Sequence, residues 1–317
     1  MVIVGNGDIM SKLEDTLKEL DILGANQDLQ TTSAIVKEFG FFPYSVWRLQ
    51  SNKLLEELCD DDIPKNTYTV KAYRDPLRRN AQKKKNYLSY QAGLSKFNTA
   101  VAQRLIEFYT KEGETILTPF GSRGIISIIA AHLGRKGVVV EVVKNYADKI
   151  VERVNNINNA QKGRLIKKYY DVTCYHANAN NMYMFADNSI DHIITSPPFF
   201  DIEKYESCEG QLADIHDYDE FLNQYQICLN ECYRVMKPDG FCIFVVNDFR
   251  KPRSKDADTE YLCFSRDTQN CLEKAGFRMW DTIINFLYST PNVISARQRF
   301  REKMMVKSHE YILVFRK

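Results

Sequence analysis

The sequence has no apolar run long enough to cross a bilayer, so a membrane-spanning protein is not expected. Its opening segment lacks both a basic start and a long apolar core, which argues against a signal peptide. The formal net charge of +2 is too small to indicate a nucleic-acid partner by itself. Any basic surface must therefore come from clustered side chains.

Cysteine and histidine are present, but not in the arrangements that bind metals or form redox pairs. None of the 8 cysteines has the two-residue spacing of a zinc knuckle, and the 5 histidines form no ligand pair. Scattered thiols in a chain of this size are typical of a reducing compartment. We therefore expect a cytoplasmic protein without a metal site.

The composition, with 44% hydrophobic and 26% charged residues, is that of a globular chain with enough apolar material for a core. Residues 1–70 predict a small N-terminal helical region, with helices over 10–23 and Ala34–Phe39. Residues 71–94 begin with a densely basic run and mark a linker or arm. From residue 95 to residue 317 the pattern changes to alternating strands and helices, which predicts the main domain.

Two basic segments fit either a solvated role or a DNA-contacting one. One is the run over residues 71–85, and the other connects the last two predicted strands. Charge runs are usually solvated, whereas clustered arginine and lysine supply the sequence-independent part of DNA binding. Under the second interpretation, the phosphate-contacting residues are Arg78, Arg79, Lys83, Lys84, Arg297, Arg299 and Arg301.

The main domain opens with the order of a βαβ unit. A short apolar strand, Thr115–Thr118, runs into the glycine-containing turn Pro119–Gly124, then a helix over Ile125–Leu133 and a second strand, Val138–Val140. Glu141 follows that strand. This order is typical of a unit that binds an adenosine ligand, although the turn lacks the full G-x-G-x-x-G pattern. The carboxylate of Glu141 is expected to accept both ribose hydroxyls.

Two further strands bring polar residues to the same edge. The strand Val172–Tyr175 precedes Asn178, whose amide can read the amine and a ring nitrogen of an adenine. The strand Asp191–Thr195 ends at the segment Ser196–Phe199. Its two consecutive prolines fix φ and donate no N–H, so neither helix nor sheet continues through them. The sequence predicts a rigid corner at the sheet edge where ligands bind in open α/β folds.

The chemistry of this corner suits methyl transfer to a planar amine. The Ser196 hydroxyl and the Pro197 carbonyl can accept the two amine hydrogens and favour the tetrahedral geometry needed for attack. Pro198 stiffens the turn, and Phe199 can stack on a base turned out of a duplex. The competing interpretation is a solvent-facing Pro-Pro turn with a buried phenylalanine.

Later segments complete an α/β pattern. Residues 201–217 predict a polar loop that is long enough to be a mobile lid or a substrate contact. The elements predicted after it are the helix Tyr218–Val235, the turn Lys237–Gly240, the strand Phe241–Val246, the helix Thr268–Ala275, and the strands Trp280–Leu287 and Glu310–Phe315.

Together, in this order, the motifs resemble those of the S-adenosylmethionine-dependent DNA amino-methyltransferases. The resemblance covers residues 95–317 and is strongest to the phage- and prophage-encoded N4-cytosine/N6-adenine DNA methylases. Ser196–Phe199 matches the family's D/N/S-P-P-Y/F catalytic motif, and Pro119–Gly124 matches its glycine loop. The Lys237–Gly240 turn and the His309–Phe315 strand match later family motifs.

The resemblance implies a Rossmann-like methyltransferase fold, with a seven-stranded, mostly parallel sheet and helices on both faces. It implies S-adenosylmethionine as cofactor and double-stranded DNA as partner, and it leaves a homodimer open. For a phage-encoded protein, the compartment would be the host cytoplasm. Phe97 would help to seat the methionine end of the cofactor. The implied cofactor-binding residues are Phe97, Thr118, Pro119, Phe120, Gly121, Gly124, Glu141 and Asn178.

Two departures from the family pattern keep alternatives open. Thr118 stands where an acidic residue is usual, and Gly121-Ser122 replaces the usual A-G. An inactive DNA-binding protein on this scaffold is one alternative, and a methyltransferase acting on RNA or a protein glutamine is another. A nucleotide-binding oxidoreductase would give the Pro-Pro corner no purpose. Serine at position 196 leans toward cytosine N4 without deciding between the two bases.

Overall fold

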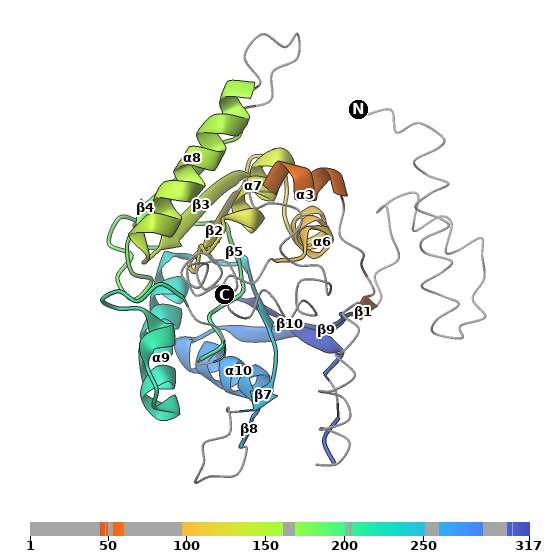
Figure 1. Ribbon diagram of the computed structural model, residues 1–317, viewed down its shortest axis with the longest axis vertical. Coiled ribbons are helices and arrows are strands. Elements are labelled where there is room, and N and C mark those ends of the chain that lie inside the picture. The colour runs from red at the N-terminus through yellow and green to blue at the C-terminus, as the bar shows by residue number, and fades with distance from the viewer. Residues whose placement is uncertain are drawn as a thin grey trace, which may run out of the picture. The chain divides into compact units, whose positions relative to one another are not determined.

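Figure 1 shows the computed structural model, which describes residues 45–47, 49, 53–59, 97–160, 169–200, 202, 205–250, 260–287, 303–305 and 307–317. The helices predicted over 10–23 and Ala34–Phe39 lie outside the described residues. The arginines and lysines predicted to contact DNA also lie outside them.

The chain divides into two compact units. The larger comprises Ser51–Asp281 and Tyr311–Lys317, and it contains every residue predicted for catalysis or cofactor binding. In the smaller unit, β1 (Val46–Trp47) pairs in parallel with the distal part of β9 (Arg278–Phe286). Trp47 is buried there, and the Ile284 N–H donates to the Ser45 carbonyl at 2.7 Å.

Among the described residues, the main sheet has eight strands in the order β1-β9-β10-β6-β5-β2-β3-β4. The pairs β2–β3, β2–β5, β3–β4 and β5–β6 are parallel, and β10 is antiparallel to β6. The strands not yet given are β2 (Thr115–Thr118), β3 (Lys136–Glu141), β4 (Val172–His176), β5 (His192–Thr195), β6 (Phe241–Val246) and β10 (His309–Arg316).

The predicted mostly parallel α/β sheet is confirmed, with one correction to the number of strands. Seven strands were expected, and the eighth is β1, which has only two residues. A strand this short cannot show the apolar alternation by which a strand is recognised in a sequence.

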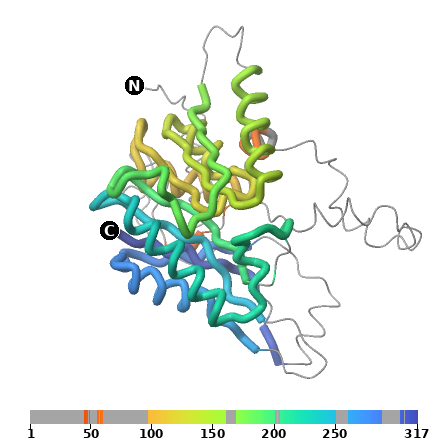
Figure 2. The backbone as a smooth tube through the Cα atoms, turned by 90° about the vertical axis from the view of Figure 1, so that its left-hand side faces the viewer, coloured from red at the N-terminus to blue at the C-terminus, as the bar shows by residue number. Residues whose placement is uncertain are grey.

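Helices cover both faces of the sheet (Figure 1 and Figure 2). On one side, α6 and α7 pack on each other, and α7 and α8 lie against β2, β3 and β4. On the other side, α9 packs against α10. The helices are α3 (Lys53–Cys59), α6 (Thr99–Tyr109), α7 (Ile125–His132), α8 (Lys144–Ala160), α9 (Tyr218–Val235) and α10 (Phe264–Ala275).

The helix ends follow from local chemistry. At the start of α6, the Asn98 side chain accepts hydrogen bonds from the Ala100 and Val101 N–H groups at 2.9 and 3.3 Å. At the start of α9, Asp217 accepts from the Glu220 N–H at 2.9 Å. Such caps satisfy N–H groups that the first helical turn leaves without partners. The predicted bounds of α6 and α9 match those of the structure.

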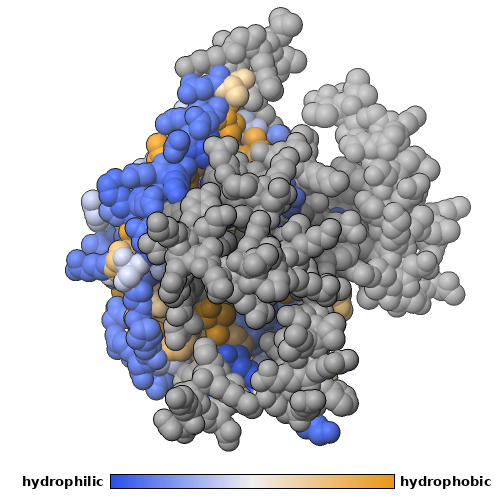
Figure 3. Space-filling view, in the orientation of Figure 1, coloured by the Kyte–Doolittle hydropathy of each residue, from blue (hydrophilic) through white to orange (hydrophobic). Residues whose placement is uncertain are grey.

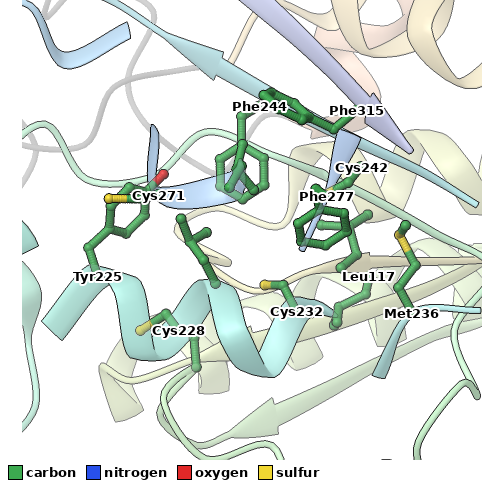
Figure 4. Close-up of a cluster of buried hydrophobic side chains, with 14 of the residues drawn as sticks. Leu117, Tyr225, Cys228, Cys232, Met236, Cys242, Phe244, Cys271, Phe277 and Phe315 are labelled. Carbon is green, nitrogen blue, oxygen red and sulfur yellow. The ribbon is translucent and has the colours of Figure 1, made fainter. Parts of the chain in front are cut away.

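The core between α9 and the sheet is rich in aromatic rings and thiols (Figure 4). Tyr225, Cys228 and Cys232 recur on one side of α9, and all are fully buried. Opposite them lies Phe244 of β6, in the same buried cluster. Burial raises the pKa of the Cys228 thiol to about 12, so this side chain is neutral and acts as a small apolar group. The core or half-buried role predicted for Cys228 and Cys232 is confirmed.

A hairpin that was not predicted follows β6. Its strands are β7 (Phe249–Arg250) and β8 (Tyr261–Leu262), paired antiparallel. Asp248 fixes its base, because the buried carboxylate accepts from the Tyr261 hydroxyl at 2.8 Å and from the Ser265 N–H at 2.9 Å. Two-residue strands give no periodic signal, which is why the sequence pattern misses them.

The outer sides of α8 and α9 are mostly hydrophilic (Figure 3), as expected for amphipathic helices. Among the helices that the structure describes, none has the length and apolar character needed to cross a membrane.

Candidate active site

A cavity opens at the carboxyl edge of the sheet, where the parallel strands β2, β3, β4 and β5 end. Its volume is about 500 Å³, including solvent at the mouth. The strand order reverses between β2 and β5, which is the position where open α/β sheets bind ligands. The cavity is lined by Pro119, Phe120, Ser122, Glu141, Val142, Asn178, Ala179, Ser196, Pro198, Tyr205, Gly210, Gln211 and Leu212.

The structure brings together predicted residues from four strand ends. Those that line the cavity are Pro119, Phe120, Glu141, Asn178, Ser196 and Pro198. The other predicted residues, which do not line it, are Phe97, Thr118, Gly121, Gly124, Pro197 and Phe199. The cavity therefore joins the expected cofactor half and the expected catalytic half of the site.

Glu141 links the glycine turn to the end of β3. Its Oε2 accepts from the Ser122 N–H at 2.6 Å, and its Oε1 accepts from the Val143 N–H at 2.8 Å. Burial raises the pKa of the carboxyl to about 7, and these backbone N–H groups oppose the rise. A carboxylate has about four acceptor sites, so Glu141 can still accept a hydroxyl beside these backbone N–H groups.

Gly121 allows the turn to pack closely against β3. Its N–H donates to the Val140 carbonyl at 3.0 Å. A Cβ at this position would lie 2.4 Å from Cγ1 of Val139, so a larger residue would push the turn away. The next residue, Ser122, has a left-handed φ of 47°. This geometry directs the Ser122 N–H toward Glu141.

Thr118, which stands where the family usually has an acid, is buried in the sheet. Its hydroxyl donates to the Ile194 carbonyl at 3.1 Å and accepts from the Ser127 hydroxyl at 3.2 Å. Thr118 therefore joins β2 to β5 and α7, and the structure does not place it at the cavity.

The Pro-Pro corner is held by one hydrogen bond and by aromatic packing. The Ser196 hydroxyl donates to the Val245 carbonyl of β6 at 3.0 Å. Because its hydrogen is used in this bond, the oxygen offers its lone pairs as an acceptor. Pro197 and Pro198 are buried. The Phe199 ring is half-buried and packs edge-on against Phe264, with 6.2 Å between centroids.

A loop closes one side of the cavity through contacts that sequence reasoning did not identify. The Glu206 N–H donates to the Tyr146 hydroxyl at 2.9 Å, and the Asn145 amide donates to the Glu206 carboxylate at 3.0 Å. The Asn178 amide donates to the Gly210 carbonyl at 3.1 Å. The only signal in the sequence was the length and polarity of residues 201–217. The lining residues of this loop that were not predicted are Tyr205, Gly210, Gln211 and Leu212. Leu212 is the first residue of the 3-10 turn η3 (Leu212–Asp214).

Replacing Gly210 by alanine should loosen this loop. Gly210 has φ of +80°, and a Cβ there would lie 2.1 Å from Nδ2 of Asn178. We expect Gly210→Ala to lower the free energy of unfolding by about 1–2 kcal/mol, the cost of a left-handed non-glycine residue. We also expect it to change the affinity for S-adenosylmethionine, because Asn178 must move. Urea denaturation and titration calorimetry measure the two effects.

Gly113→Ala provides a matched control. Gly113 has a similar φ of +85°, but a Cβ there would meet nothing within 4 Å. This variant should show the backbone cost without a change in affinity. Equal cofactor affinity in the two variants would contradict a role for the Asn178–Gly210 contact.

Comparison with known proteins gives one family match, over the carboxyl-terminal part of the chain. The model of the DNA methylase family (N6_N4_Mtase) matches residues 190–317, a range that includes the Pro-Pro corner. The resemblance expected from the sequence is confirmed over this range. The chain has a Rossmann-like fold, and its residues 190–317 are similar to the DNA methylases. None of the curated proteins compared with the chain matches it.

Several solved structures are similar in part. One is an S-adenosylmethionine-dependent methyltransferase from Methanosarcina mazei, 13% identical, with 67% of this chain and 96% of that chain covered and a TM-score of 0.45. Another, from Aquifex aeolicus, is 17% identical, with 78% and 96% covered and a TM-score of 0.42. A third is described as a candidate DNA modification methylase from Thermus thermophilus in complex with S-adenosyl-L-methionine. It is 24% identical, with 44% and 50% covered and a TM-score of 0.32.

Proposed function

We propose that this protein transfers a methyl group from S-adenosylmethionine to the exocyclic amine of a base in double-stranded DNA, at cytosine N4 or adenine N6. The observation that carries the proposal is that Ser196 of the Pro-Pro corner and Glu141 line the same cavity. An acceptor for an amine and a carboxylate for a ribose thus lie at one sheet edge. The family match over residues 190–317 supports this assignment.

The residues of the cavity fit an adenosine-containing cofactor. Glu141 would accept the ribose hydroxyls, and the Asn178 amide would read the adenine. Pro119 and Phe120 supply an apolar wall beside them. When bound, S-adenosylmethionine supplies an electrophilic methyl group. Phe97, Gly121 and Gly124 remain proposed as supports of this cofactor site.

The corner would act on the target base by holding its amine. The Ser196 oxygen and the Pro197 carbonyl accept the amine hydrogens and favour a tetrahedral nitrogen, so no strong base is needed. Phe199 would stack on the flipped base, and Pro198 keeps the backbone rigid. Positioning two bound reactants supplies most of the rate. The DNA contacts proposed for Arg78, Arg79, Lys83, Lys84, Arg297, Arg299 and Arg301 rest on the sequence.

Cofactor binding should depend on pH through Glu141. Burial raises the pKa of this carboxyl to about 7. Below that pH the carboxylate becomes protonated and is a weaker acceptor for the ribose hydroxyls. We expect the affinity for S-adenosylmethionine to be about tenfold weaker at pH 6 than at pH 8, as one proton uptake requires. Titration calorimetry across this range measures the effect, and an affinity that does not change with pH would contradict it.

The contribution of Glu141 to the stability of the ligand-free protein should fall as the pH rises, whereas the affinity for the cofactor should increase. A carboxyl whose pKa is raised from 4.5 to about 7 on folding binds more protons in the folded state between these values. Its contribution to stability is therefore fully present below pH 4.5 and is lost as the pH rises to about 7.

The proposed substrate is tested by offering DNA, RNA and protein to the purified protein with radiolabelled S-adenosylmethionine. We expect label in double-stranded DNA. Label confined to RNA or to protein glutamine would support the alternative methyltransferases. Cofactor binding without transfer to any of the three would support an inactive DNA-binding protein. A phage origin stays a prediction.

A further inference from the structure

The hairpin of β7 and β8 presents an arginine to solvent in a fixed position. Arg250 is exposed, and its guanidinium carbon lies 5.2 Å from the centroid of the Tyr261 ring. The two residues are paired in the antiparallel ladder, so their side chains share one face of the hairpin. Tyr261 is itself 41% exposed. The pair is therefore a cation–π contact at the surface, and it leaves the N–H groups of the arginine open to a ligand.

A buried carboxylate at the base of the hairpin holds this pair. A hairpin with two-residue strands has little stability of its own. Asp248, which is only 4% exposed, accepts from the Tyr261 hydroxyl at 2.8 Å, and from the Ser265 N–H and hydroxyl at 2.9 and 2.7 Å. A buried charge is costly unless such hydrogen bonds compensate for the lost water. Asp248 thus orients an exposed ring, and the ring in turn orients the arginine.

Arg250 has no acidic partner in the part of the chain that the structure describes. In contrast, Lys144, Lys237 and Arg266 each have an aspartate oxygen within 3.3 Å. An arginine that is held in place without an acid is suited to bind an anion from outside the chain. Its planar fork of N–H donors matches the oxygens of a phosphate.

The hairpin lies next to the Pro-Pro corner in the chain and in space (Figure 1). β7 begins three residues after the end of β6, whose Val245 carbonyl accepts from the Ser196 hydroxyl. Phe249 of β7 packs on Phe264, and Phe264 also contacts Phe199 of the corner. A base turned out of a duplex stays attached to its strand. A base held at the corner would therefore keep its neighbouring phosphates close to this hairpin.

We propose that Arg250, oriented by Tyr261 and Asp248, binds a backbone phosphate of the DNA next to the target base. This inference rests on the proposed function. It adds a contact surface within the described residues to the DNA contacts expected from the sequence. Such a contact positions the duplex and does not select the base. The Tyr261 ring would contribute by restricting the guanidinium, so that less side-chain freedom is lost on binding.

The test measures the binding of a short fluorescein-labelled DNA duplex by fluorescence anisotropy, in salt from about 50 to 200 mM. A phosphate contact does not depend on base sequence, so the recognition sequence need not be known. We expect Arg250→Ala to weaken binding about tenfold, because it removes a hydrogen bond between charged groups. The slope of log K against log salt should become shallower by about 0.9, as the loss of one phosphate contact requires. The affinity for S-adenosylmethionine, measured by calorimetry, should not change.

Arg266→Ala is the matched control, since it also removes one exposed cation, on α10, where Arg266 pairs with Asp267 at 3.3 Å. It should leave the affinity and the salt slope unchanged. Equal affinity and equal slope in the two variants would overturn the inference. An effect of Arg250→Ala confined to the corresponding RNA duplex would also overturn it. An unchanged protein that binds no DNA duplex would instead refute the proposed function from which the inference starts.

Discussion

Replacing Ser196 by alanine is expected to reduce methyl transfer by about 100- to 1,000-fold, the usual loss when one preorganised polar group of a transition-state site is removed. The Ser196 oxygen lines the cavity, and its hydrogen is already donated to the Val245 carbonyl. The variant removes this fixed acceptor for the amine. Cofactor affinity should stay within about threefold, because the serine is assigned to the base and not to the donor. Single-turnover transfer and calorimetry separate the two quantities.

Ser189→Ala controls for the loss of a serine hydrogen bond. The Ser189 hydroxyl also donates to a backbone carbonyl, that of Ala186 at 2.7 Å, but it does not line the cavity. This variant should keep full activity. If Ser196→Ala retained more than a tenth of the transfer rate, or lost cofactor binding as well, the corner would be a structural turn.

Changing Glu141 to glutamine is expected to weaken S-adenosylmethionine binding on the order of 100-fold, because hydrogen bonds to a charged group contribute about 1.5–3 kcal/mol each. Glutamine keeps the shape but replaces one acceptor oxygen with an NH₂ group. That group can no longer accept a hydroxyl, and it faces a backbone N–H from Ser122 or Val143. The dependence of affinity on pH should disappear in the same variant. Calorimetry at pH 6 and pH 8 measures both effects.

Asp148→Asn is the control for removing a carboxylate from this part of the chain. Asp148 is exposed on α8, where it pairs with Lys144 at 2.7 Å, and it should not affect the cofactor. A Glu141→Gln protein with unchanged affinity would show that the acid has no ribose contact. The adenosine assignment of the cavity would then fail.

Elements with strong local signals could be predicted from the sequence. The helix α9 has apolar residues at helical spacing and an aspartate cap at its start, and its predicted bounds match the structure. The strand β6 is a continuous apolar run with a turn before it, and it matches as well. The predicted helix Thr268–Ala275 starts too late, because α10 begins at Phe264, where Ser265 bonds to the distant Asp248.

The site was predictable where it depends on strand ends, and not where it depends on contacts between distant segments. Glu141 ends β3, Asn178 and Ser196 follow β4 and β5, and parallel pairing brings the three to one cavity. The bond between Asn178 and Gly210 joins residues 32 apart through a loop conformation that no local pattern encodes. The placement of Thr118 also depends on partners in β5 and α7, so only the fold shows that its hydroxyl is used within the core.

The most direct test of the account is mass spectrometry of nucleosides from unmodified double-stranded DNA incubated with the protein and S-adenosylmethionine that carries a deuterated methyl group. We predict deuterated N4-methylcytosine or N6-methyladenine, formed about 100- to 1,000-fold more slowly when Ser196 is replaced by alanine. Unlabelled DNA, or label found only on a ring carbon as 5-methylcytosine, would contradict transfer to an exocyclic amine.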